Sequence, residues 1–140
     1  MELTSKESAI DSCILLRIIL RDNPSQYQQA TSLLLSGTEF YVDDVVIMEA
    51  VYVLTKEGMS RTSILDNLIT LLDNPMLDYD RQFYSGVFER YDTHPSLSFD
   101  DCVLEARIAM KRKEPLWTFD KKFAHQSTSA KLLSSSEKAA

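Results

Sequence analysis

Apolar and polar residues alternate along this chain in blocks that predict helices joined by short strands. In the longer blocks apolar side chains recur at the period of a helix with one buried face. Shorter apolar blocks stand between them and are typical of buried strands. The pattern predicts strands at residues 8–10, 39–42, 76–79, 116–119 and 131–133, and helices at 14–20, 24–35, 44–56, 60–73, 80–91, 98–113 and directly after 120.

Local signals support several of these boundaries. Asn23 followed by Pro24 is typical of a helix start, and Ser60 is well suited to begin a later helix. Asp44 is expected to cap the helix that runs to residue 56. Pro115 is expected to end the last long helix, because proline cannot continue one.

The order of the elements indicates the architecture. Helices alternate with strands, and no repeat or linker interrupts them, which favours one parallel sheet with helices on both faces. With 140 residues, 44% of them hydrophobic, the chain is long enough to bury a core as one domain. We therefore expect a single α/β domain over residues 1–133 and a frayed, serine-rich tail over residues 134–140.

The formal net charge of −6 argues at first against a nucleic-acid partner, because contacts to phosphate need lysine and arginine. The basic residues are unevenly placed, however. Between residues 107 and 122 there are six of them against two acids, so this stretch carries +4. If acids elsewhere hold cations, the effective charge is less negative than the formal one, and acidity does not exclude RNA.

A reducing cytoplasm is the expected location. The two cysteines, Cys13 and Cys102, do not form the dense pattern of a secreted disulfide scaffold, although a bridge between them stays possible. The first 24 residues have no basic leader, and Arg17 interrupts the apolar run at 14–20. Both features argue against a signal peptide and a membrane span.

Carboxylates stand at the ends of two predicted strands. Asp11 follows the first strand, and Asp120 follows the strand at 116–119. Ligands of open α/β sheets bind beyond the carboxyl ends of the strands, so both side chains could project into one crevice. An aspartate between strand and helix is also a good cap, and for either residue alone the capping interpretation weighs at least as much.

Glu49 lies inside an apolar helix segment, between residues 45–48 and 50–54. Such a helix is expected to be mostly buried, and a buried carboxylate is costly unless it is paired with a cation or a metal. The alternative is that its face of the helix reaches solvent, as a narrow polar stripe shared with Asp44 or Tyr52.

Two acids, Asp100 and Asp101, begin the helix at 98–113, where the helix dipole favours negative charge. Capping accounts for one of them, and the other could face the crevice; the apolar spacing does not choose between them. Glu105, one turn beyond Asp101, is expected to be a solvated surface acid rather than a partner of the site.

These acids would supply oxygen ligands only. No histidine or cysteine cluster has the spacing of a zinc site, and His94 and His125 are isolated, so Mg²⁺ or Mn²⁺ is the expected metal. The sequence also lacks a glycine-rich phosphate loop, a GxSxG turn and a dinucleotide fingerprint. A receiver domain or a haloacid dehalogenase-like phosphatase would need a further acid after Asp11, where Ser12 and Cys13 stand.

Four stretches together resemble the PIN domain family (PilT N-terminus), and VapC-like toxins in particular. They are AIDSCILLRIILRD, VIMEAVYVL, LSFDDCVLEA and LWTFDKKFA, in the order and at the spacing that such proteins show. The resemblance runs from Ala9 to about Leu133 and implies a three-layer α/β/α domain with a central parallel sheet of four to five strands. It also implies a catalytic, metal-binding site of four acids, which are Asp11, Glu49, Asp101 and Asp120 in this chain.

The resemblance implies the chemistry as well. Such proteins are ribonucleases that hydrolyse RNA with Mg²⁺ or Mn²⁺, which activate the attacking water and stabilise the leaving oxygen. Asp101 is preferred over Asp100 as the ligand, because the family's acid precedes a small residue and an apolar helix. Ser12, Thr118 and Asp100 are expected to support the ligands without binding the ions. Glu49 either binds an ion or positions the attacking water.

The chain departs from the family at identifiable positions. The first block usually reads Asp-Thr-Asn, whereas here Ser12 keeps the hydroxyl and Cys13 lacks the amide. Ser98 stands where many relatives have a further aspartate. These changes make a catalytically weakened, PIN-like RNA-binding or protein-interaction module the alternative interpretation.

Several basic residues are candidates for RNA contact, although charge at a helix end is also typical of a solvated terminus. The resemblance further implies a homodimer and a small antitoxin protein as partner. The candidate RNA-binding residues are Arg17, Lys111, Arg112, Lys113 and Lys121.

Overall fold

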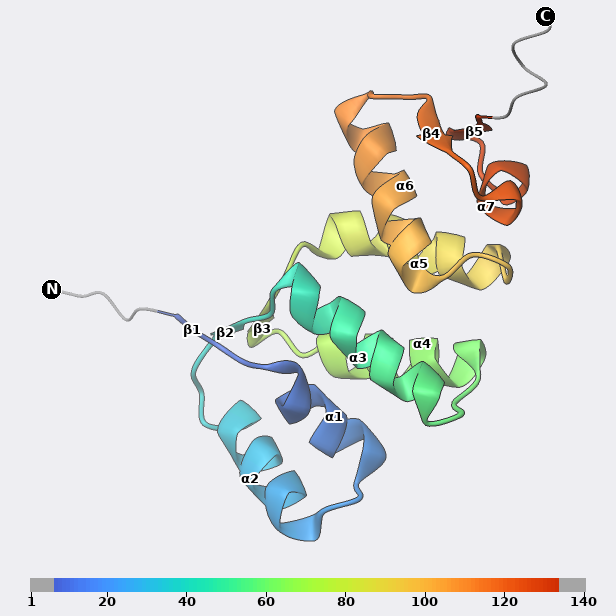
Figure 1. The fold of residues 1–140 in the computed structure, drawn as a ribbon. Helices are drawn as coiled ribbons and strands as arrows, with labels where there is room; N and C mark the ends of the chain where they lie inside the picture. The colour runs from blue at the N-terminus through green and yellow to red at the C-terminus, as the bar shows by residue number, and fades with distance from the viewer. Residues whose placement is uncertain (1–6, 134–140) are drawn as a thin grey trace, which may run out of the picture. The chain divides into compact units, whose positions relative to one another are not determined.

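The computed structural model describes residues 7–133 and divides into two compact units, the first ending at Asp80 and the second beginning at Arg81. Figure 1 shows the elements of both. The first unit contains β1 (Ser8–Ala9), α1 (Ser12–Leu20), α2 (Pro24–Leu34), β2 (Phe40–Tyr41), α3 (Asp44–Lys56), α4 (Arg61–Leu72) and β3 (Leu77–Asp78). The second unit contains α5 (Arg81–Thr93), α6 (Phe99–Lys111), β4 (Leu116–Thr118), α7 (Lys121–Gln126) and β5 (Ala130–Leu132).

All described strands pair in parallel. In the first unit the order is β1-β2-β3, with Ser8 paired to Phe40 and Phe40 to Leu77. In the second unit β4 pairs with β5, so that Trp117 lies opposite Lys131. The α/β class and the parallel pairing are thus confirmed, and the described strands form one sheet in each unit. The single domain over 1–133 stays a prediction, and the tail at 134–140 lies outside the described residues.

Side-chain caps set several helix boundaries as the sequence predicts. Asn23 accepts a hydrogen bond of 3.0 Å from the backbone N–H of Gln26, and Ser60 accepts one of 3.1 Å from that of Ser63. Each cap satisfies a backbone donor that has no partner within the helix. The predicted starts of α2 and α4 are therefore confirmed.

Two predicted boundaries are wrong. Helix α3 is capped by Asp43 rather than Asp44, because Asp43 Oδ2 accepts a hydrogen bond of 3.1 Å from the Val45 N–H and Asp44 is already helical. Helix α6 ends at Lys111, four residues before Pro115, so the proline is not what ends it. Arg112 takes up the left-handed conformation, with φ of 56°, directly after the last helical residue.

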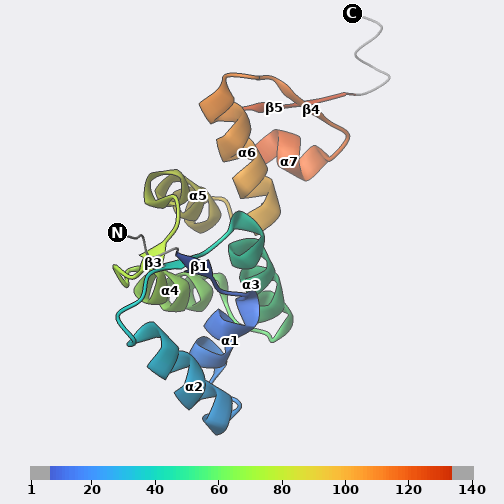
Figure 2. The ribbon, with the colours of Figure 1, turned by 90° about the vertical axis from the view of Figure 1, so that its left-hand side faces the viewer.

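The two units bury different kinds of side chain. In the first, α1 packs against α2 and α3, and α3 against α4 (Figure 2). The buried side chains there are aliphatic and include Leu15, Ile47 and Leu68. In the second, α5 packs against α6 through a chain of rings. Their centroids lie 5.1–6.1 Å apart, and the rings belong to Phe83, Tyr84, Phe88, Tyr91 and Phe99.

Both cysteines are free thiols, Cys13 exposed and Cys102 buried, so the bridge that the sequence left possible is not formed. Within the described residues, no helix has the length and apolar character needed to cross a membrane.

Candidate active site

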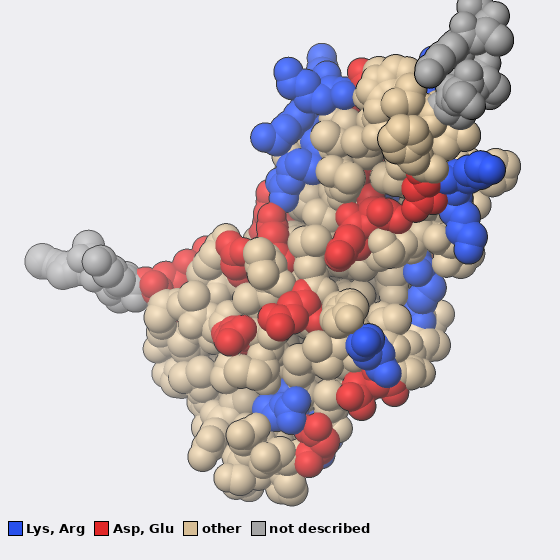
Figure 3. All heavy atoms as spheres, viewed as in Figure 1, with Lys and Arg blue, Asp and Glu red and all other residues tan. Residues whose placement is uncertain are grey.

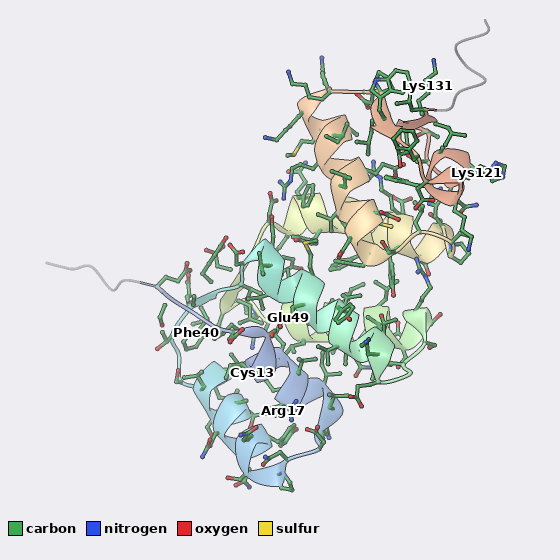
Figure 4. The ribbon with its side chains drawn as sticks, viewed as in Figure 1. Cys13, Arg17, Phe40, Glu49, Lys121 and Lys131 are labelled. Carbon is green, nitrogen blue, oxygen red and sulfur yellow. The ribbon has the colours of Figure 1, made fainter. Side chains whose placement is uncertain are left out.

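Asp11 and Glu49 are connected through Ser12. Asp11 caps α1, where its Oδ1 accepts a hydrogen bond of 2.7 Å from the backbone N–H of Ser12. The buried Ser12 hydroxyl donates to Glu49 Oε1 at 2.9 Å and lies 3.5 Å from Asp11 Oδ1. One serine at the start of α1 therefore holds a carboxylate from the α1 cap close to a carboxylate from α3. Figure 4 labels Glu49 on α3 and Cys13, the residue after Ser12.

Glu49 is exposed, so the expectation that it is buried in an apolar helix is wrong. Helix α3 buries Ile47, Ala50, Val51 and Leu54 on one face. Val45, Glu49 and Tyr52 are spaced by four and three residues on the opposite face and reach solvent. The open face shared with Tyr52 is the alternative that the sequence offered. What distinguishes Glu49 is its hydrogen bond to Ser12 rather than burial.

The Asp11 and Glu49 carboxylates have no cationic partner in the described part of the chain. Arg17, in the same helix as Ser12, is paired instead with Asp22 at 2.9 Å. Two nearby carboxylates without a counter-charge repel each other, and a bound cation relieves that repulsion. Over residues 7–133, no three side chains of His, Cys, Asp or Glu are grouped closely enough to hold an ion.

In the second unit, Ser98 rather than an acid caps α6. Its hydroxyl accepts a hydrogen bond of 3.1 Å from the Asp101 N–H. The expectation that Asp100 or Asp101 serves as the cap is therefore wrong. Ser98, one residue before the helix, already accepts the hydrogen bond that a cap provides for. Asp101 is half-buried in the first turn, and Asp100 is exposed.

Asp120 caps α7 and is supported by Thr118. Its Oδ1 accepts a hydrogen bond of 3.1 Å from the Phe123 N–H, and its own N–H donates to Thr118 Oγ1 at 2.9 Å. Thr118 thus contacts the backbone N–H of Asp120, and its role in supporting a metal ligand stays a prediction. Asp120 is exposed, and among the described residues no hydrogen bond joins it to Asp101.

Glu105 is only 4% exposed, so the expectation of a solvated surface acid is wrong. Its Oε1 accepts a hydrogen bond of 2.8 Å from Arg90 Nε, and its Oε2 accepts one from the Ser127 hydroxyl. The signal in the sequence was its place one turn from Cys102 and next to Ala106, which are both buried. A carboxylate on the buried face of a helix needs such partners.

The candidate RNA-binding residues differ in how available their charge is. Arg17 is half-buried and paired with Asp22, which compensates its charge. The other four are exposed and lie in the second unit, at the end of α6 and the start of α7; they are Lys111, Arg112, Lys113 and Lys121.

Comparison with known families identifies the chain. A model of the PIN domain family matches residues 9–128, which include all four candidate acids. This chain belongs to the PIN domain family. PIN domains are typically nucleases, and PIN nucleases typically use divalent metal ions. No curated protein and no solved structure matched the chain.

The donor atoms of this PIN domain suit such an ion. Asp11, Ser12 and Glu49 present oxygen atoms only, and hard divalent cations prefer oxygen ligands. Both carboxylates are open to solvent, so a hydrated ion can reach them without movement of the core. The residues of the first unit are therefore compatible with the metal that the family uses.

Proposed function

We propose that this PIN domain is a metal-dependent endoribonuclease of the VapC toxin type, with Asp11, Glu49, Asp101 and Asp120 as the ligands of Mg²⁺ or Mn²⁺. The observation that carries the proposal is that Ser12 binds both acids: its backbone N–H donates to Asp11 and its hydroxyl donates to Glu49. The serine thereby holds two carboxylates near each other, and no cationic side chain among the described residues pairs with either of them. Membership of a family of nucleases supplies the reaction class.

The side chains of the first unit have distinct roles in this proposal. Asp11 is fixed by the N-terminus of α1, and Ser12 orients Glu49 through one oxygen. The second Glu49 oxygen accepts no hydrogen bond from the described residues, so it is suited to take a proton from an attacking water. A bound divalent ion would supply charge to activate that water and to stabilise the leaving oxygen.

The test is cleavage of mixed RNAs by the purified protein with Mg²⁺, with Mn²⁺ and with chelator. The wild type should cleave only with metal, and Asp11→Asn should not cleave while keeping its melting temperature. Asp66→Asn, which changes an exposed acid of α4, is the matched control and should cleave normally. Metal-dependent cleavage by a folded Asp11→Asn protein would contradict the proposal.

Cys13 favours a second candidate function, a PIN-like module that binds RNA or protein without cutting. It is exposed next to Ser12 and places a thiol where the family usually has an amide. Titration calorimetry with Mn²⁺ separates the two candidates, because a non-cutting module has no need of the ion. Saturable Mn²⁺ binding that is lost in Asp11→Asn supports the nuclease, and no heat of binding supports the module.

The resemblance to VapC toxins further leads us to propose a homodimer and a small antitoxin partner in the cytoplasm. Light scattering on the purified protein tests the dimer. Co-purification with the product of a short neighbouring reading frame tests the antitoxin. A bound antitoxin should also suppress RNA cleavage, whereas an unrelated small protein should not.

A further inference from the structure

Strand β4 presents aromatic side chains to solvent. Trp117 is 54% exposed, and Phe119, directly after the strand, is 77% exposed. Leu116 and Thr118, which alternate with them, are half-buried. Alternate residues of a strand point to opposite sides, so one side of β4 is turned to its own unit and the other displays rings that would normally be buried.

The neighbouring strand adds a positive charge to the same surface. Lys131 lies opposite Trp117 in the parallel ladder, and its Nζ is 5.5 Å from the centre of the Trp117 ring. Ala130 and Leu132 on either side of it are half-buried, so Lys131 also points outward. We name this surface the aromatic platform: Trp117, Phe119 and Lys131.

Further basic side chains flank the aromatic platform. Residues 107–131 contain seven lysines and arginines and two acids. Lys121 and Lys122 begin α7 immediately after Asp120, and both are exposed. Figure 3 shows blue lysine and arginine side chains on the second unit beside uncharged surface, and Figure 4 labels Lys121 and Lys131 there. The charge around the rings is therefore opposite to that of a phosphate backbone.

We propose that the aromatic platform binds single-stranded RNA, with bases stacked on Trp117 and Phe119 and phosphates contacted by Lys131 and Lys121. Exposed rings among basic side chains are the combination that unpaired nucleotides need, because every base has a face that stacks and every linkage carries a charge. A duplex hides its base faces and cannot use the rings. This inference rests on the proposed function for the choice of RNA, and it assigns the surface of the second unit that would hold an unpaired strand.

The platform adjoins one of the proposed catalytic acids. Phe119 is the residue before Asp120, whose side chain is fixed by the first turn of α7. A base stacked on Phe119 would bring its own phosphodiester linkage close to that carboxylate. The platform would therefore hold the strand at a defined distance from the point of cleavage.

The first unit contains a matched pair that lacks the charged surroundings. Lys56 Nζ lies 5.4 Å from the centre of the exposed Tyr52 ring on α3. The first unit is strongly acidic, with twelve acids and four basic residues between residues 7 and 80. Tyr52 and Lys56 therefore control for a lysine beside an exposed ring in a unit of net negative charge.

Intrinsic fluorescence tests the proposal directly, since Trp117 is the single tryptophan of the chain. The protein is titrated in chelator, so that no cleavage occurs, with a short oligouridylate and with a duplex RNA of equal length. The oligouridylate should quench the emission saturably and bind about tenfold more tightly than the duplex, as loss of base stacking predicts. Phe119→Ala should weaken binding by about fivefold or more.

Lys131→Gln should weaken binding and lower the salt dependence by about 0.7 in the log–log slope, the value for one phosphate contact to a single strand. It removes a charge from an exposed residue and leaves both rings in place, so it keeps the test valid if an aromatic variant misfolds. Tyr52→Ala and Lys56→Gln should bind like the wild type.

Three results would overturn the platform. The first is a labelled oligouridylate that binds without changing the Trp117 emission. The second is an equal loss of affinity in Tyr52→Ala and Phe119→Ala. The third is a shielded, blue-shifted emission that reddens as a dimer dissociates, which would mean that a second copy of the chain covers the rings. Binding in chelator without any cleavage in Mg²⁺ would instead leave the platform standing and refute the nuclease.

Discussion

The two units of this protein differ most in their charge. Residues 7–80 contain twelve acids and four basic residues, a formal charge of −8, whereas residues 81–133 contain seven acids and nine basic residues, a formal charge of +2. A net charge of −6 describes neither of them. A protein that binds both cations and phosphates needs both kinds of surface, and this chain separates them along its sequence.

The units also use their acids differently. In the first, Glu49 is exposed and accepts a hydrogen bond from the Ser12 hydroxyl. In the second, Glu105 is buried and tied to Arg90 and Ser127. Glu49 is therefore available to a ligand, whereas both carboxylate oxygens of Glu105 are occupied by hydrogen bonds within the fold. A carboxylate within an apolar helix segment can thus be structural or available to a ligand. Which of the two applies depends on its burial and its hydrogen-bond partners.

The strongest test of this contrast removes one proposed ligand from each unit. Asp11→Asn and Asp120→Asn should each lower Mg²⁺-dependent RNA cleavage by more than about a hundredfold, since loss of a ligand exceeds the 10- to 100-fold effect of residues that only orient ligands. Initial cleavage rates at saturating Mg²⁺ measure the effect.

Matched controls exist for both variants. Asp66→Asn and Asp92→Asn change exposed acids in the first and second unit, respectively, and should keep the wild-type rate. Normal cleavage by Asp120→Asn would show that the acids of the first unit suffice. The second unit would then have no part in the chemical step and at most a role in binding RNA.

A second test compares the contributions of the buried Glu105 and the exposed Glu49 to stability. Glu105→Ala leaves the Arg90 guanidinium without its partner and should lower the free energy of unfolding by about 2–3 kcal/mol, somewhat less than for fully buried pairs because Arg90 is partly exposed. Glu49→Ala should change stability little, as exposed sites do. Urea denaturation measures both, with Glu89→Ala on the exposed side of α5 as control. Equal losses for Glu49→Ala and Glu105→Ala would contradict the contrast.

Much of the fold was predictable from the sequence because caps and apolar spacing are local. Asn23 and Ser60 begin the helices as expected, and the strands lie where short apolar blocks stand. The caps at Asp43 and Ser98 were missed since in each case an acid stood close by and a neighbouring side chain was better placed to accept the backbone hydrogen bond. A choice between adjacent residues depends on backbone angles, which spacing does not fix.

The candidate site was less accessible to sequence reasoning. Spacing indicated that Glu49 was unusual, but its exposure follows from which face of α3 packs against α1 and α4, a tertiary property. The same argument applied to Glu105 would have been correct, because its helix face is buried. For Asp11 and Asp120, the pattern alone supported a capping role at least as well as a role in the site. The resemblance to the PIN family was what favoured the site.

A third test concerns the residue that connects the acids of the first unit. Ser12→Ala removes the hydroxyl that donates a hydrogen bond to Glu49. It should weaken Mn²⁺ binding by about 10-fold, the lower end of the range for residues that orient a metal ligand. Ser12→Thr restores the hydroxyl and should recover most of the affinity. Calorimetric titration with Mn²⁺ is the readout, and Ser25→Ala at the exposed start of α2 is the control. Unchanged affinity in Ser12→Ala would mean that the serine is only part of the core.

The acids of the first unit are not equivalent in their protonation. Loss of hydration, followed by the hydrogen bond and charge of Asp78 and the charge of Glu39, raises the pKa of Glu7. Hydrogen bonds from the Val45 N–H and then from the Tyr41 hydroxyl lower the pKa of Asp43. The same hydrogen bond raises the pKa of Tyr41. At Asp43 these two hydrogen bonds therefore outweigh the loss of hydration, which acts to raise the pKa.

The smallest effect we expect is on the acid side of the stability curve. Because the folded-state pKa of Asp43 is depressed, its charge stabilises the fold above the ordinary value of 3.8, and this contribution is lost as the pH falls through the folded value. Asn also caps helices well, so Asp43→Asn should fold normally and lack only that component. Its melting temperature should lie slightly below that of the wild type at neutral pH, and the difference should shrink as the pH falls below 3.8 and vanish below the folded-state pKa of Asp43. Asp66→Asn, which caps no helix, should show no such convergence, and a constant difference for Asp43→Asn would mean that the cap works through geometry and not through charge.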